Sequence, residues 1–202
     1  MIGHKGPRGP DDGPPALVIP GFLANDHTTM ELRRFLAREG WRVHGWHHGR
    51  NQGAYAGMLE DMIDRLDAVR GGEKALLVGW SLGGVIAREV AREVPEKVRA
   101  VVTLASPFSG HPKLNNVWPL YEKVAGHRVD DTPVRQSPDK PPVPTLSLVA
   151  ERDGLLAQRA QCGLAHESDR CVKLPCGHLR IGLSRSMLRR VMAEIGDFVG
   201  TP

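Results

Sequence analysis

The stretch LLVGWSLGG (residues 76–84) decides the fold class, because it leads from an apolar run through a glycine-flanked serine into a helical pattern. The run before Gly79 has the composition of a buried strand, and the helical pattern continues up to Pro95. A serine in this G-x-S-x-G turn is typical of an exposed nucleophile, with glycines that let the strand and the helix pass closely. The stretch therefore predicts an α/β fold with Ser81 at the carboxyl edge of a sheet.

Six apolar runs rich in Val, Leu and Ile have the composition of strands. They are ALVIP (16–20), WRVHGW (41–46), ALLVGW (75–80), VRAVVTLA (98–105), TLSLVA (145–150) and RCVKL (170–174). Most of them lack polar alternation, which favours strands that are buried on both faces in a parallel sheet covered by helices.

Amphipathic stretches lie between these runs. Thr28 and Glu31 form a capping-box pattern at the start of one stretch, and Gly40 is expected to end it. Apolar residues recur at helical spacing in two others: Leu59, Met62, Ile63 and Leu66, then Leu188, Val191, Met192 and Ile195. The alternation predicts one α/β domain over residues 1–202, with a reduced, mostly parallel sheet of about six strands and helices on both faces.

Two segments depart from this alternation. Residues 1–15 are rich in Gly and Pro and are expected to form a flexible lead-in. Residues 106–142 are rich in Pro around one short candidate helix near residues 117–124, and an insertion of this length is usually functional or disordered. Its apolar residues predict a short cap lying over part of the domain: Val117, Trp118, Leu120 and Tyr121.

Charge and composition exclude several classes of protein. The formal net charge is +4, and the basic residues are spread along the chain, which argues against nucleic-acid binding. No segment approaches the ~20 apolar residues that span a bilayer, and the start of the chain has no apolar signal-peptide core. We therefore expect a soluble, cytoplasmic protein, and the sequence does not predict its oligomeric state.

The cysteines and clustered histidines predict neither a disulfide framework nor a metal site. Cys162, Cys171 and Cys176 are expected to be reduced in the cytoplasm, although the sequence leaves a bridge such as Cys162–Cys171 open. His47 and His48 are adjacent and would point apart, and no cysteine or paired carboxylate completes a site with them. We expect no metal and no other cofactor.

A serine nucleophile needs a histidine to take its proton and an acid to orient that histidine. In a strand–turn–helix architecture the chain order is serine, acid, histidine, and each follows a strand. Asp153 follows the run 145–150 in the turn ERDG, and His178 follows the run 170–174 in the loop PCGH. We predict that Asp153 and His178 form a catalytic triad with Ser81.

Other acids and histidines fit these roles less well. Glu151 lies closer to its strand than Asp153, and Asp169 precedes the last strand, at its wrong end. Other histidines precede the last strand, lie in the insertion or follow the second strand: His166, His111, His127, His44, His47 and His48. Most of these are expected at surface or half-buried positions without a chemical role.

The tetrahedral intermediate of acyl transfer also needs two backbone N–H donors. The residue after the nucleophile, Leu82, supplies the first. The first run ends in Pro20-Gly21-Phe22, where Gly21 permits an unusual turn and the Phe22 N–H is expected to face the site. Phe22 and Leu82 are therefore the predicted oxyanion-hole donors.

The segments VIPGF, GWSLGG, LASPFSG, ERDGLL and CGHLRIG, in this order, resemble the α/β-hydrolase superfamily, specifically its small bacterial esterase-like or lipase-like members. The resemblance covers about residues 16–200. It implies Ser81 as nucleophile, Asp153 as acid and His178 as base. Where the family usually has His-Gly in the oxyanion loop this chain has Pro20-Gly21, and we expect the family's usual first two strands to be absent.

Four further residues are expected at the substrate. HHGRNQGAYAG (47–57) is similar to a segment at the active-site rim of such small hydrolases, which implies that Asn51 helps to shape the entrance. Gly21 and Trp80 adjoin the predicted donors and nucleophile, and Trp118 belongs to the cap.

The leading hypothesis is a serine hydrolase that cleaves small-molecule carboxylic esters, with short to medium acyl chains favoured because the cap is short. The alternatives are a thioesterase, amidase or acyltransferase, which share the acyl-enzyme, and a binding protein that kept the fold without turnover.

Overall fold

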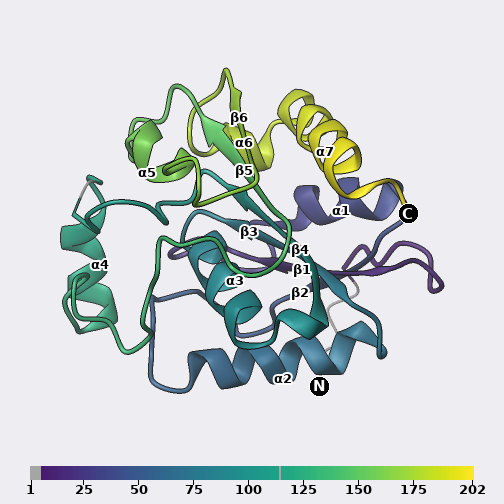
Figure 1. Cartoon of the computed structure of the whole chain (residues 1–202), viewed down its shortest axis with the longest axis horizontal. Coiled ribbons are helices and arrows are strands. Elements are labelled where there is room, and N and C mark those ends of the chain that lie inside the picture. Colours follow the sequence, from purple (N-terminus) through teal and green to yellow (C-terminus); the bar gives the residue numbers. More distant parts are fainter. Residues whose placement is uncertain (1–5, 114) are drawn as a thin grey trace.

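A computed structural model describes residues 6–113 and 115–202. Its centre is a six-stranded, fully parallel sheet with strand order β2-β1-β3-β4-β5-β6 (Figure 1). The strands are β1 (Pro15–Ile19), β2 (Arg42–Gly45), β3 (Ala75–Trp80), β4 (Val98–Leu104), β5 (Thr145–Ala150) and β6 (Arg170–Leu174). All six predicted runs are strands, so the predicted fold class is confirmed.

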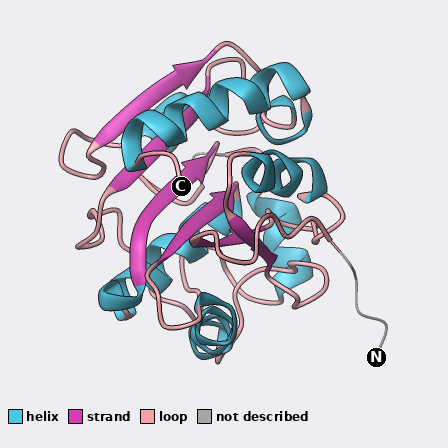
Figure 2. Cartoon of the chain, turned by 90° about the vertical axis from the view of Figure 1, so that its right-hand side faces the viewer, coloured by secondary structure: helices cyan, strands magenta, loops and turns pink. Residues whose placement is uncertain are grey.

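Helices cover both faces of the sheet (Figures 1 and 2). One face packs against α1 (Met30–Arg38), α6 (Arg180–Leu183) and α7 (Arg185–Val199), and the other against α2 (Met58–Arg70) and α3 (Leu82–Glu93). A 3₁₀ turn, Pro95–Lys97, leads into β4. Of the two short helices α4 (Trp118–Ala125) and α5 (Gln158–Cys162), α5 packs against β5, and α4 lies apart from the sheet (Figure 1). Among the helices of the described residues, none combines the length and the apolar composition that a bilayer span requires.

Alternate residues of the strands build two apolar cores, one on each face. Val18 and Val78 point to the α1/α7 side, whereas Leu17 and Leu77 point to the α2/α3 side. Both predicted helical repeats are confirmed, because the four apolar residues of α7 are fully or almost fully buried and α2 buries Met62 and Leu66.

The start of α1 differs from the predicted capping box. Thr29, and not Thr28, is the N-cap residue, and it makes no side-chain cap bond. The Thr28 hydroxyl instead hydrogen-bonds the side chain of Asn25, which forms its own turn before the helix. Gly40, with φ of +96°, follows the helix end as predicted.

The described part of the lead-in is packed against the sheet. The Arg8 carbonyl accepts a hydrogen bond from the Val43 N–H at 2.7 Å, and the Gly13 carbonyl accepts one from the Arg42 side chain at 3.1 Å. Arg8 and Gly13 are therefore hydrogen-bonded to a backbone N–H and a side chain of β2, and the flexibility expected for the lead-in stays a prediction. Residues 1–5 lie outside the described part of the chain.

The turn between β3 and α3 is packed so closely that two glycines are required. Ser81 has φ of +54°, in the region that L residues rarely adopt. A Cβ on Gly79 would lie 2.3 Å from the Gly83 carbonyl oxygen, and one on Gly83 would lie 2.2 Å from the Ile19 carbonyl oxygen. The prediction that the flanking glycines make room for strand and helix is confirmed.

A disulfide joins Cys162, at the end of α5, to Cys171 in β6, whereas Cys176 is a free, buried thiol. The expectation of three reduced cysteines is therefore wrong for two of them. The bridge left open by the sequence forms because α5 packs against β5, the strand next to β6, and the two Cα atoms lie 5.7 Å apart.

We expect Gly83→Ala to lower the free energy of unfolding by about 1–3 kcal/mol, because the added methyl group overlaps the β1 backbone. Gly154→Ala is the matched control, since a Cβ there has no neighbour within 4 Å. Urea unfolding of both variants measures the effect. Equal stability of Gly83→Ala and the wild type would contradict the close packing.

Replacing both Cys162 and Cys171 by Ala should lower the free energy of unfolding by about 2–3 kcal/mol, because the bridge closes a short loop in the unfolded chain. Urea unfolding with and without reductant measures the loss. Thiol titration in denaturant gives an independent check, with one reactive thiol expected before reduction and three after it. Three thiols without reductant would show that the bridge does not form.

Candidate active site

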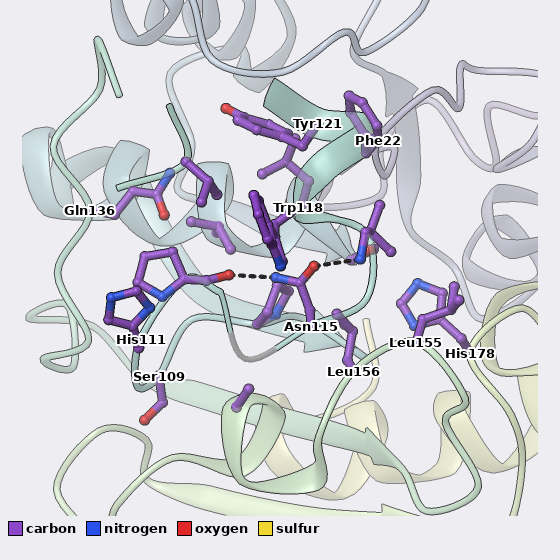
Figure 3. Close-up of a pocket in the computed structure, with 18 residues that line it drawn as sticks. Phe22, Ser109, His111, Asn115, Trp118, Tyr121, Gln136, Leu155, Leu156 and His178 are labelled. Atoms are coloured by element: carbon purple, nitrogen blue, oxygen red, sulfur yellow. Dashed lines mark hydrogen bonds between the residues drawn. The ribbon is translucent and has the colours of Figure 1, made fainter. Parts of the chain in front are cut away.

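Because all six strands run parallel, the loops after β1, β3, β4, β5 and β6 meet at one edge of the sheet. A cavity of about 80 Å³ opens there, and Figure 3 shows its lining. Ser81 and His178 both line it, as do Phe22 and Leu82. Apolar side chains make up most of the remaining wall: Val85, Pro107, Pro112, Val117, Trp118, Tyr121, Val129, Leu155, Leu156 and Ala160.

Asp153 and His178 are paired beside this cavity. The Asp153 Oδ2 atom lies 2.7 Å from His178 Nδ1, and the Asp153 side chain has no exposed surface. The N–H groups of Leu155 and Leu156 donate to Asp153 Oδ1 at 2.8 and 2.9 Å. The backbone of the loop after β5 therefore holds Oδ1 of the carboxylate, and Oδ2 contacts the imidazole of His178.

Gln161 is a member of this cluster that the sequence analysis missed. Its Nε2 atom donates to Asp153 Oδ2 at 2.9 Å, and its Oε1 atom accepts the Ala150 N–H at 2.9 Å. A glutamine in a helix of five residues has no periodicity or motif to mark it. The signal that was available is its place within ten residues of the predicted acid.

The competing acids lie elsewhere. Glu151 is exposed. Its N–H donates a hydrogen bond to the carbonyl of Leu174, the last residue of β6. Asp169 accepts hydrogen bonds from Lys140 and from the Thr145 N–H, at the amino end of β5. Neither carboxylate reaches His178 among the contacts of the described residues.

His44 lies in β2, and His47 and His48 follow it; none of these three lines the cavity. Burial and the nearby Arg65 and Arg42 lower the pKa of His44 to about 4, so this side chain is neutral at pH 7. His111 lines the cavity, and His127 Nε2 contacts the Ala54 carbonyl at 2.8 Å. Within the part of the chain that the structure describes, no three His, Cys, Asp or Glu side chains converge as metal ligands would.

Trp80 contacts the loop that carries His178 and does not line the cavity. Its indole N–H donates to the His178 carbonyl at 3.3 Å, and the two ring centroids lie 6.4 Å apart. Gly182 packs flat on the indole, where a Cβ would lie 2.9 Å from the ring. The expected substrate contact of Trp80 is therefore not supported, because its side chain points into the core beneath the histidine loop.

The loop after β1 lies directly against the serine. A Cβ on Gly21 would lie 3.0 Å from the Ser81 Cβ and 3.1 Å from the Trp80 carbonyl oxygen, so the glycine permits this contact. Phe22 lines the cavity, and Leu82 is the first residue of α3, where an N–H has no acceptor within its helix. Both predicted donor residues are thus at the cavity beside Ser81.

Asn51 braces this loop and does not contact the cavity. It is fully buried, and its side-chain amide donates to the Pro20 carbonyl at 2.8 Å. Its backbone pairs with the same loop, through the Leu23 N–H at 2.6 Å and the Ala24 carbonyl at 2.9 Å. The expected role at the entrance is replaced by one in fixing the loop that carries Phe22.

Described residues of the segment 106–142 line one side of the cavity, where α4 lies apart from the other helices at the left of Figure 1. Trp118 and Tyr121 of this helix line the cavity (Figure 3). The Tyr121 hydroxyl accepts the Ala54 N–H at 3.0 Å, and its ring packs against Phe22 with centroids 5.3 Å apart. Asn115 forms an antiparallel bridge with Leu156, beside the acid.

The return of this segment is tied to α3 by the buried Arg88. Its Nη2 atom donates to the carbonyls of Pro138, Asp139 and Glu167, and its guanidinium stacks 4.0 Å above the Phe108 ring. Burial lowers the pKa of Arg88 to about 10, so it stays charged at pH 7.

Comparison with known proteins identifies relatives of part of this chain. The chain is similar to the pimeloyl-[acyl-carrier protein] methyl ester esterase of Yersinia pseudotuberculosis, with 41% identity over 88 residues, which is 42% of this chain and 33% of that protein. The chain spans a third or less of the length of the curated relatives it matches.

Two solved structures share the fold over nearly the whole chain. A lipase-esterase related protein from Clostridium acetobutylicum superimposes with a TM-score of 0.69 at 18% identity, over 95% of this chain and 97% of that one. Carboxylesterase CesB from Bacillus subtilis gives a TM-score of 0.65 at 18% identity, over 93% and 85%. A family profile described as the alpha/beta hydrolase fold matches residues 14–166. The chain therefore belongs to the alpha/beta hydrolase fold family.

Proposed function

We propose that this protein is a serine hydrolase that cleaves carboxylic esters, with Ser81, His178 and Asp153 as its catalytic triad. The observation that carries the proposal is the buried Asp153–His178 pair at 2.7 Å, whose histidine lines the same cavity as Ser81 on its strained turn. A buried carboxylate on Nδ1 leaves Nε2 as the nitrogen that takes the serine proton.

The steps of the reaction follow from these positions. His178 removes the proton from the Ser81 hydroxyl as its oxygen attacks the ester carbonyl, and the N–H groups of Phe22 and Leu82 stabilise the oxyanion. Collapse of the intermediate expels the alcohol, which takes the proton from His178, and leaves an acyl group on Ser81. Water, deprotonated by the same histidine, then releases the acid.

The comparisons support the ester chemistry. The Yersinia pseudotuberculosis relative is named a methyl ester esterase, and its similarity covers 42% of this chain. Thioester, amide or acyl-transfer substrates would form the same acyl-enzyme. Hydrolysis of a series of esters tests these alternatives, because a lack of turnover on every ester would favour them.

We further propose that residues 106–142 act as a cap that limits the acyl chain. The cavity is small and mostly apolar, and Trp118 and Tyr121 of α4 form one wall of it. A wall of aromatic rings favours short to medium acyl groups because a long chain would have to displace them.

Hydrolysis of p-nitrophenyl esters from acetate to palmitate tests the function. We expect wild-type turnover to be highest on short to medium acyl chains. Ser81→Ala should lose turnover on every ester while remaining folded, because it cannot form the acyl-enzyme. Ser109→Ala, a second serine at the cavity, is the matched control. Turnover by Ser81→Ala at the wild-type rate would refute the assignment, and no turnover of any ester would favour another acyl substrate or a binding role.

Trp118→Ala should raise kcat/KM for longer esters about tenfold relative to acetate, because it removes one wall of the cavity. Leu120→Ala on the same helix is the control, since Leu120 is exposed and does not line the cavity. The chain-length profile is the measurement. An unchanged profile would show that Trp118 does not limit the acyl group, and unfolding would show that it belongs to the core.

A further inference from the structure

We infer that Gln161 is a positioning residue that holds the Asp153 carboxylate in the orientation His178 needs. This inference rests on the proposed function. It starts from the observation that Asp153 Oδ2 is shared by His178 Nδ1 at 2.7 Å and Gln161 Nε2 at 2.9 Å.

The Gln161 amide can lie in only one orientation. Its side chain is almost completely buried, with 1% of the residue exposed. Oε1 accepts the Ala150 N–H, while Nε2 donates both to Asp153 and to the Leu156 carbonyl at 3.3 Å. A flipped amide would place its oxygen against the carboxylate and its N–H₂ against an N–H, so both ends would repel their neighbours.

This fixed amide restrains the carboxylate. Two backbone N–H groups, of Leu155 and Leu156, hold Oδ1, and Gln161 holds Oδ2. A carboxylate bound at both oxygens cannot rotate about its terminal bond without losing a hydrogen bond in a buried site. His178 therefore meets an acceptor whose direction is set before substrate arrives, which favours the tautomer with Nδ1 protonated.

Contacts on both sides of Gln161 fix its own position. Helix α5 has five residues, too few to be stable alone. The next residue, Cys162, is bonded to Cys171 in β6, which pairs with Ser147 of β5. On the other side, the Ala160 carbonyl accepts the Ser109 N–H at 3.1 Å. The disulfide and this bond hold the short helix over the end of β5.

The rival explanation is that Gln161 only satisfies the buried Ala150 N–H. That role is structural, and its loss would lower stability without acting through Asp153. The two explanations differ in how Gln161 couples to Asp153, so a double-mutant cycle separates them.

The test compares Gln161→Met with the control Gln158→Met on p-nitrophenyl acetate. Gln158 lies on the same helix, but it is exposed and donates to the Glu151 carbonyl. We expect Gln161→Met to lower kcat about 10- to 100-fold with KM changed less than twofold, and Gln158→Met to leave both unchanged. In an Asp153→Asn background, which should itself lose about 10⁴ in kcat, Gln161→Met should cost less than twofold more. An equal loss in both backgrounds, or no loss at all, would overturn the inference.

Gln161→Glu keeps the test decisive if the Met variant does not fold, because a Glu oxygen still accepts the Ala150 N–H. Its carboxyl group faces Asp153, and two adjacent carboxylates share a proton and titrate as a pair. The ratio of its kcat to the wild-type kcat should therefore rise as pH falls from about 9 to about 6, since the shared proton restores a donor. A ratio that does not change with pH would contradict a donor role.

Labelling of Ser81 by a fluorophosphonate separates this inference from the proposed function. Wild-type protein that is not labelled at Ser81 would refute the proposed function, and the inference with it. Fast labelling of the wild type that is equally fast in Gln161→Met would refute the inference alone. We expect fast labelling of the wild type and of Gln158→Met, and labelling of Gln161→Met that is slower by at least tenfold.

Discussion

Three backbone segments meet at the turn after β3 with no space between them. A Cβ on Gly83 would overlap the end of β1, and one on Gly79 would overlap the first turn of α3. This contact holds Ser81 at φ of +54°, an arrangement that only the surrounding packing can maintain. The other parts of the site are placed relative to this one fixed serine.

The parallel sheet supplies those other parts from loops far apart in the sequence. The loop after β1 lies against Ser81, and the loops after β5 and β6 bring Asp153 to His178. The Asp153 carboxylate is fully buried, and its partners are two backbone amides, one side-chain amide and an imidazole. No Lys or Arg contacts it among the hydrogen bonds and ion pairs of the described residues. A site built in this way orients the acid by hydrogen-bond geometry, with little contribution from a fixed neighbouring charge.

The sequence predicted the strands and the glycine-flanked turn at Ser81 because both leave strong local signals. Fully buried strands are continuous apolar runs, and the serine turn requires its glycines. The misses concern groups whose positions depend on how the chain packs in three dimensions. Gln161 lies on a helix too short for periodicity, and the bridge from Cys162 depends on how that helix folds back over β6. Trp80 was placed near the substrate because it adjoins Ser81, and Asn51 because its segment resembles an active-site rim, yet both side chains point into the protein.

A β-bridge between Asn115 and Leu156 joins the segment 106–142 to the loop after β5 that contains Asp153. Asn116 adds a hydrogen bond from its N–H to the Leu155 carbonyl at 3.0 Å. The N–H groups of these same two leucines hold Asp153 Oδ1. Moving the segment 106–142 away from this loop would therefore disturb the N–H groups that hold the Asp153 carboxylate. Access to the cavity and the orientation of this carboxylate are thus coupled.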